Sequence, residues 1–167
     1  MSNTGNEQID ITRSQVIAVF TKGIELIKEK MDVEEYRKKY NAFEDYSVLL
    51  TITNLKVLGI TTKLSLTMAF KIEGNEPKVS ENVKNPDILG ECSYETLKSM
   101  CRGMIKIKRG PNKGSYLKFS PEKALQKGML RFSGRGAAWL TKVSFLDDIF
   151  GDMQRLGITK TLFKMLP

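Results

Sequence analysis

The sequence of 167 residues contains no histidine. Histidine is the side chain best suited to proton transfer near neutral pH and the commonest transition-metal ligand. Its absence excludes serine–histidine and cysteine–histidine nucleophiles, and it excludes histidine-based zinc sites. Catalysis by carboxylate or lysine side chains stays open, so the absence lowers the expectation of an enzyme without removing it.

Cysteine is also scarce, because Cys92 and Cys101 are the only two. Their spacing of nine residues matches neither a redox pair nor a zinc knuckle. Cys101 falls on the apolar side of a predicted helix, so we expect a reduced thiol packed in the interior. The sequence therefore predicts no disulfide, no metal and no cofactor.

Long apolar runs are missing as well. No stretch approaches the ~20 apolar residues of a membrane-spanning helix. Residues 1–8 lack the positively charged and apolar regions of a signal peptide. We therefore expect an intracellular protein, cytoplasmic or nuclear, that is not secreted and has no transmembrane segment.

Acidic residues are nearly absent from one long segment. Between Lys98 and Lys142 the chain carries twelve lysine or arginine residues and a single acid, Glu122, a net charge of +11. The other residues hold fifteen basic and eighteen acidic side chains, so the whole formal charge of +8 comes from residues 98–142. Charge of one sign at this density destabilises a compact fold through self-repulsion, and a polyanionic partner compensates it.

The amino-terminal part has a helical pattern. Apolar side chains at three- and four-residue steps predict a helix over residues 12–31, which begins at Thr12 with a capping box to Gln15. Residues 1–11 are expected to be a flexible amino terminus. We expect residues 12–167 to form a single globular domain.

The pattern then changes to the alternation typical of strands. Residues 46–53 and 63–72 predict an antiparallel hairpin with a turn near Gly59. Residues 73–91 are polar, contain proline and glycine, and predict a mobile loop. Ser93 then caps a short helix that ends near Gly103.

A second hairpin, residues 104–119, and a brief helix from Ser120 follow. Residues 129–132 predict a strand, and alternation at Trp139, Thr141, Val143 and Phe145 predicts another. An amphipathic helix and a short apolar tail end the chain. The predicted fold class is α+β, with antiparallel β-hairpins forming one or two sheets packed by an N-terminal helix and a C-terminal amphipathic helix.

The second hairpin is the candidate binding surface. Ile105, Ile107, Leu117 and Phe119 are expected to face the core. The exposed face and turn would then hold Lys106, Lys108, Arg109, Lys113, Tyr116 and Lys118. A ribbon of cations with one aromatic ring suits a phosphate backbone. An ordinary solvated face, kept basic to prevent edge pairing, is the alternative.

Three further cations extend the predicted polyanion-binding set: Arg131, Arg135 and Lys142. Around Arg135, two glycines allow either an anion-binding nest of backbone N–H groups or a tight turn. Separately, the last helix and tail hold more apolar side chains than one core needs. Self-association is therefore expected, through Phe150, Met153, Leu162 and Phe163.

The sequence therefore predicts a non-catalytic binding protein that engages a polyanion through residues 98–142 and self-associates. The favoured partner is nucleic acid, RNA before DNA, or a nucleoprotein. An anionic membrane surface is the second, as in an assembly protein of the viral-matrix kind. The alternative is an enzyme that acts on a phosphorylated substrate or nucleic acid through lysine or aspartate chemistry.

Overall fold

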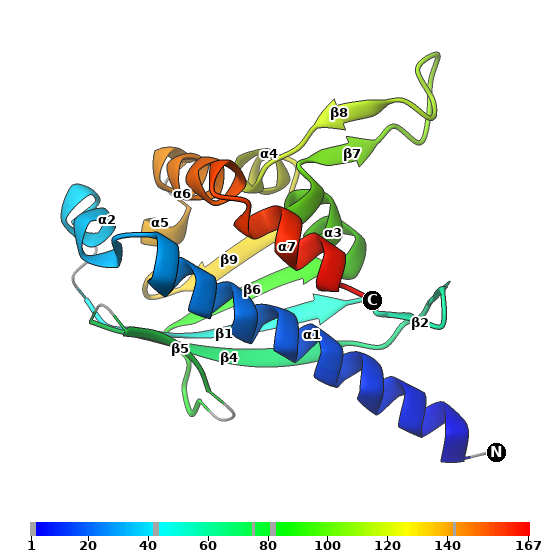
Figure 1. Cartoon of the computed structure of the whole chain (residues 1–167), viewed down its shortest axis with the longest axis horizontal. Helices are drawn as coiled ribbons and strands as arrows, with labels where there is room; N and C mark the ends of the chain where they lie inside the picture. Colours follow the sequence, from blue (N-terminus) through cyan, green and yellow to red (C-terminus); the bar gives the residue numbers. More distant parts are fainter. Residues whose placement is uncertain (1–2, 42–43, 75, 81–82, 142) are drawn as a thin grey trace.

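A five-stranded sheet with the order β5-β4-β1-β6-β9 is the frame of the fold (Figure 1). The computed structural model describes residues 3–41, 44–74, 76–80, 83–141 and 143–167. The strands of the sheet are β1 (Tyr46–Thr53), β4 (Leu66–Glu73), β5 (Glu76–Ser80), β6 (Ile88–Ser93) and β9 (Leu130–Gly134). Neighbouring strands pair antiparallel except β1 and β6, which are parallel. The predicted α+β class is confirmed.

The first predicted hairpin is confirmed as the pair β1 and β4, in which Leu50 lies opposite Met68. Between these strands the chain makes a smaller ribbon of β2 (Lys56–Val57) and β3 (Ile60–Thr61). The turn of this ribbon contains Gly59, where the sequence predicts a turn.

Helices cover one face of the sheet, as Figure 1 shows. Their bounds are α1 (Asn3–Lys30), α2 (Val33–Lys39), α3 (Tyr94–Arg102), α4 (Pro121–Gln126), α5 (Ala137–Leu140), α6 (Val143–Arg155) and α7 (Ile158–Met165). The expected start of the first helix at Thr12 is wrong. The Thr12 hydroxyl donates to the Gln8 carbonyl, 2.9 Å away, inside a helix that begins at Asn3. The flexibility of residues 1–11 stays a prediction.

Short-range capping signals are confirmed. The Ser93 side chain accepts a hydrogen bond from the Thr96 N–H at the start of α3, and Gly103 ends that helix with φ of 78°. Ser120 accepts one from the Lys123 N–H at the start of α4. Each cap satisfies a backbone N–H that has no partner within its helix.

The strand predicted at Trp139, Thr141, Val143 and Phe145 is wrong, because the chain is helical in α5 and again from Val143. Phe145 and Met153 are buried on the same side of α6, and this longer helical period outweighs a short alternation. The expected apolar tail is also helical, since α7 follows Gly157 directly.

Residues 73–91 contain more regular structure than the sequence predicts, because β5 and most of β6 lie within them. Ile88 and Cys92 in β6 are buried, whereas Leu89 and Glu91 between them are exposed. The strand lies between β1 and β9, inside the sheet. The expectation of one long irregular loop is therefore wrong, since the irregular segment is the shorter connection between β5 and β6. The mobility of that connection stays a prediction.

We expect trypsin to cut this connection at Lys84, which is exposed in a bend between the two strands. The two fragments should stay together, because β6 in one fragment pairs with β1 in the other. Intact-mass measurement separates this cut from cuts at Lys108 or Arg109, and size-exclusion chromatography reports whether the fragments part. Separation of the fragments would contradict a single domain.

The core has two parts. One lies between α1, α7 and the sheet and includes Val16, Ile52 and Ile158, each 0% exposed. The other lies under α3 and α4 and includes Met100, Phe119, Ala124 and Leu130. Close packing of α7 on α1 depends on Gly23, where an added Cβ would lie 3.2 Å from Leu162 Cδ1.

Candidate polyanion-binding surface

The second predicted hairpin is confirmed as a two-stranded ribbon that projects from the body of the protein (Figure 1). Its strands are β7 (Met104–Lys106) and β8 (Tyr116–Lys118). The Phe119 N–H donates to the Gly103 carbonyl at the base, 2.9 Å away, and Phe119 itself is 1% exposed. A buried aromatic ring therefore anchors the ribbon in the second part of the core.

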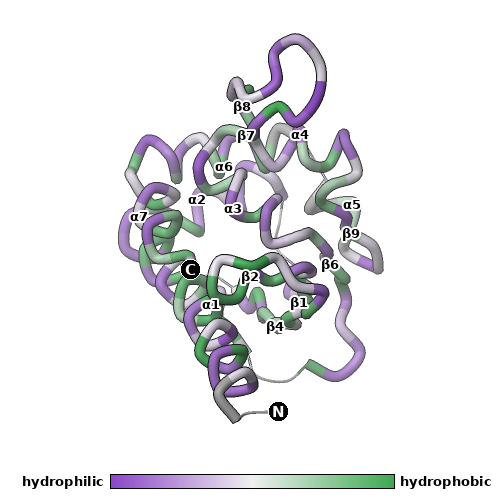
Figure 2. Tube along the Cα trace, turned by 90° about the vertical axis from the view of Figure 1, so that its right-hand side faces the viewer, coloured by the Kyte–Doolittle hydropathy of each residue, from purple (hydrophilic) through white to green (hydrophobic). Residues whose placement is uncertain are grey.

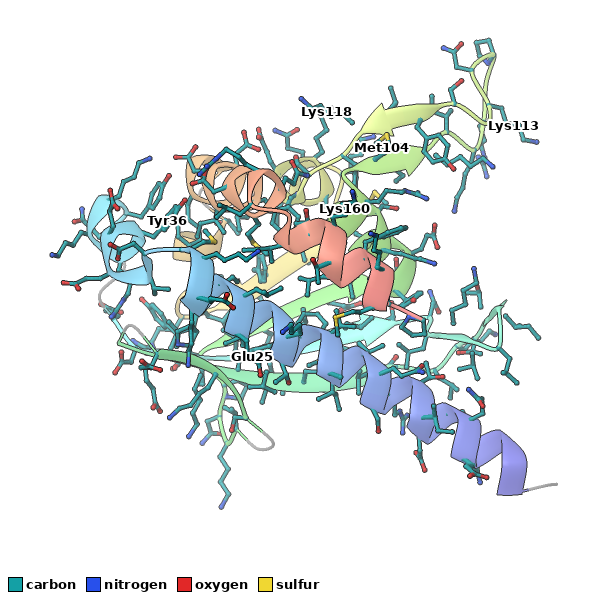
Figure 3. All side chains as sticks on the ribbon, viewed as in Figure 1. Glu25, Tyr36, Met104, Lys113, Lys118 and Lys160 are labelled. Carbon is teal, nitrogen blue, oxygen red and sulfur yellow. The ribbon has the colours of Figure 1, made fainter. Side chains whose placement is uncertain are left out.

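The cations of the ribbon are exposed and lack carboxylate partners. All five side chains are solvent-exposed: Lys106, Lys108, Arg109, Lys113 and Lys118. Within the described residues, none of them has a carboxylate oxygen within 4.0 Å. Figure 3 shows Lys113 at the far end of the ribbon and Lys118 near its base. Their charge is therefore not neutralised by ion pairs of the described chain.

The strand register decides which side chains share a face. Lys106 lies opposite Tyr116, and Met104 lies opposite Lys118, so these four side chains share one face. The shared face predicted for Lys106, Tyr116 and Lys118 is therefore confirmed. The expectation that Leu117 faces the core is wrong, because Leu117 is 50% exposed. The ribbon extends past the body, so only its base at Phe119 is buried.

Tyr116 is held by a cation that the sequence prediction missed. The Arg102 guanidinium lies over the Tyr116 ring, 4.9 Å from its centroid, and Arg102 Nε donates to the Met104 carbonyl at 3.4 Å. Tyr116 is still 48% exposed, so part of its ring is open to a ligand. One signal in the sequence could have identified Arg102. It ends the helix predicted from Ser93 and stands next to Gly103, directly before the hairpin.

A further cation joins the base of the ribbon. Lys123 Nζ donates to the Lys118 carbonyl, 3.2 Å away. A cavity of about 370 Å³ next to them brings Lys118 and Lys123 together with Glu122 and Asp147. The alternative of an enzyme requires an acid in a pocket beside the cations, and this cavity provides that arrangement. The described part of the chain contains no group of three or more metal-ligating side chains.

Arg131 and Arg135 are not part of the ribbon and have carboxylate partners instead. Arg131 pairs with Glu91 across β6 and β9, with Nη2 and Oε1 2.9 Å apart. Arg135 pairs with Asp87 at 3.1 Å and lies over the Tyr46 ring, 5.1 Å from its centroid. Lys142 lies outside the described residues.

The surroundings of Asp87 favour the tight turn over the anion-binding nest. The Arg135 backbone N–H, which the nest would use, donates to the Asp87 carbonyl at 2.8 Å. The Ser47 backbone N–H donates to the Asp87 carboxylate and, with Arg135, holds the pKa of that carboxyl below its usual range. The glycines therefore position an ion pair within the chain.

The apolar residues predicted for self-association are used within the chain. Met153 and Leu162 are 7% and 8% exposed, and Phe150 and Phe163 pack partly buried against the same core. Met153 and Leu162 are therefore part of the core, and the expectation that they form surplus apolar surface is wrong. Self-association itself stays a prediction.

A second cavity, of about 360 Å³, lies between α1 and the sheet. Phe20, Ile24, Leu50 and Phe70 are among the mainly apolar side chains that line it. Lys71 and Lys78 also line it, but no acid among the described residues does. The cavity therefore lacks the combination of an acid with cations that the enzyme alternative requires.

No protein-family model matches the chain, and no curated protein matches it significantly. Among the described residues, no helix is both long enough and apolar enough to cross a membrane.

Proposed function

We propose that the protein is a non-catalytic binding protein that holds single-stranded nucleic acid, RNA in particular, on the β7–β8 ribbon. The observation that carries the proposal is the set of five exposed cations without a carboxylate partner in the described chain. Each such cation that contacts a phosphate displaces a condensed counterion, which favours binding at moderate salt.

Tyr116 favours a single strand over a duplex. A base of a single strand can stack on an exposed aromatic ring, and such stacking contributes about 1–3 kcal/mol per base. Arg102 already covers part of the ring and holds it in place, so less side-chain freedom is lost on binding. Lysines on the same face as Tyr116 would follow the backbone on both sides of the stacked base.

The variant K106Q/K108Q/K118Q is expected to bind single-stranded uridine RNA more weakly than the natural sequence. The slope of log K against log salt should fall in magnitude by roughly 2, at about 0.7 for each phosphate that a lysine no longer neutralises. The free energy of unfolding should change by less than about 0.5 kcal/mol per substitution, because the three side chains are exposed. Fluorescence anisotropy over a salt series measures both affinity and slope.

The variant K30Q/K38Q/K160Q is the matched control, since it removes the same charge from exposed positions outside the ribbon. Equal binding by both variants, with equal slopes, would assign the ribbon lysines to an ordinary solvated face. Parallel titrations with duplex DNA and anionic vesicles identify the preferred polyanion. The RNA recovered after binding should keep its length, and its cleavage would favour the enzyme alternative at the cavity of Asp147.

A further inference from the structure

The tip of the β2–β3 ribbon exposes two large apolar side chains. Leu58 is 76% exposed and Ile60 is 67% exposed, the highest values among the large hydrophobic residues that the structure describes. Single exposed apolar residues are common on protein surfaces. Two at the end of one projecting ribbon form a small patch, and such a patch on a protrusion indicates a contact site.

The backbone of this tip makes the choice of leucine unusual. Val57 pairs with Ile60, and the two residues between them have positive φ, 51° at Leu58 and 77° at Gly59. Two-residue hairpin turns of this kind favour asparagine or aspartate followed by glycine. A bulky apolar residue at positive φ is rare and strained. The turn itself therefore does not explain Leu58, whereas a role for its side chain outside the chain does.

The base of the ribbon is rigid. The Leu55 N–H donates to the Leu64 carbonyl, and the Thr62 N–H donates to the Leu55 carbonyl, both at 3.0 Å. Leu55 is 0% exposed and fixes the ribbon in the core under α1. The tip is therefore held out in solvent in a fixed direction, which limits the entropy lost on binding.

The segment that carries the β2–β3 ribbon has charge of one sign. The sequence has no acid between Asp45 and Glu73. Lys56 lies at the base of the ribbon opposite Thr61, and Lys63 follows β3 by two residues. Neither lysine has a carboxylate within 4.0 Å among the described residues. A symmetric contact between the tips of two copies would bring the same lysines together and be repelled. An anionic surface with an apolar interior complements both the lysines and the tip.

Both ribbons project toward the same side of the molecule. In Figure 1 the β2–β3 ribbon and the far end of the β7–β8 ribbon extend to the right of the sheet. Figure 2, viewed from that side, shows β2 near the centre and β7–β8 at the top. Met104 and Leu117 of the second ribbon are 43% and 50% exposed beside its lysines. The two ribbons therefore present two points that combine apolar and cationic side chains on one side of the molecule, toward which the first turns of α1 also project.

We propose that the β2–β3 tip inserts Leu58 and Ile60 into the interface of an anionic lipid bilayer. Lys56 and Lys63 then lie at the level of the lipid headgroups, where each anionic headgroup attracts them. One small apolar tip gives weak, reversible binding, so the cations of β7–β8 supply the second attraction that stable docking requires. The membrane contact does not require bound nucleic acid, but it shares the β7–β8 cations with the proposed nucleic-acid site.

The variant L58N/I60T tests the insertion. Asparagine followed by glycine is the pair that this turn favours, and threonine in place of Ile60 keeps a β-branched residue in β3, so the fold should be retained with a melting temperature no lower than that of the natural sequence. Flotation with vesicles of phosphatidylcholine and about one-third phosphatidylserine should show partitioning lowered at least about tenfold. RNA binding should be unchanged.

Two controls keep this result specific. L89T removes another exposed apolar side chain, on the sheet, and should float like the natural sequence. L58C, labelled with a polarity-sensitive dye, should show a blue shift with anionic vesicles, whereas labelled K38C on α2 should not. Labelling is selective because Cys92 and Cys101 are buried.

Flotation of L58N/I60T equal to that of the natural sequence, with no shift of the label at position 58, would overturn the proposal. Loss of concentration-dependent light scattering in L58N/I60T, with flotation unchanged, would also overturn it and make the tip a contact between copies. Loss of RNA binding in K106Q/K108Q/K118Q bears on the proposed function and leaves this test unaffected.

Discussion

The substitution Gly134→Ala is expected to lower the free energy of unfolding by about 2–5 kcal/mol. Gly134 ends β9 with φ of +106°, and an added Cβ would lie 2.4 Å from the Asp87 carbonyl oxygen. The clashing atom belongs to the backbone of the adjacent strand end, so no side chain can swing aside to relieve it. Urea denaturation measures the loss, and the melting temperature should fall by roughly 5–15 °C.

Gly128→Ala is the control for the conformational part of this loss. Gly128 also has positive φ, +70°, but no atom lies within 4 Å of its added Cβ. Its substitution should cost only about 1–2 kcal/mol, from the strained backbone alone. Equal losses in the two variants would contradict the proposed clash at Asp87.

Stability is expected to fall by several kcal/mol as the pH rises from about 9 toward 12. Burial raises the pKa of the Cys92 and Cys101 thiols from 9.0 to about 12. Above pH 9 the unfolded chain releases these protons while the folded chain keeps them, which favours unfolding. The stabilisation is therefore complete below about pH 9 and is lost as the pH rises through about 12. Burial also raises the pKa of Tyr94 to about 12, which acts in the same direction.

Urea denaturation at neutral pH and near pH 11 measures this loss. The variant C92A/C101A is the control, because it keeps the other titrating groups of the chain. It should be less stable at neutral pH, since it leaves small cavities, but should lose less stability on going to alkaline pH. An equal alkaline loss in both proteins would show that the two thiols are not its cause.

Local signals predicted much of the fold. The caps at Ser93 and Ser120 depend on contacts three residues away, so the sequence around them is sufficient. The two antiparallel hairpins depend on alternation and on turn residues near Gly59 and Gly110, which are also local.

The place of β6 depends on contacts that the sequence does not show. Gly90 weakens its strand pattern, yet an added Cβ there would lie 3.0 Å from Phe132 and 3.1 Å from Leu50. The glycine is required because two larger side chains from the neighbouring strands meet above it. The local sequence shows that position 90 is a glycine. It does not show that Phe132 and Leu50 fill the space where a side chain would lie.

Only part of the candidate surface was predicted, because it too depends on contacts that the sequence does not show. The excess of cations in residues 98–142 pointed to the ribbon, whose five exposed cations have no carboxylate oxygen within 4.0 Å among the described residues. The same count included Arg131 and Arg135, whose partners Glu91 and Asp87 come from outside the segment. Charge counted along the chain cannot show ion pairs formed across a sheet.

The hydrogen bond between Gly103 and Phe119 places the two ends of the β7–β8 ribbon side by side, with N and O 2.9 Å apart. The ribbon is therefore an insertion between α3 and α4 whose length can change while the helices keep their positions, because closing a longer loop costs little free energy. Substitutions in residues 106–118 can change the proposed binding surface with little effect on the core. The proposed surface and the stability of the fold can therefore evolve separately, and a ribbon of another sequence could be exchanged for this one.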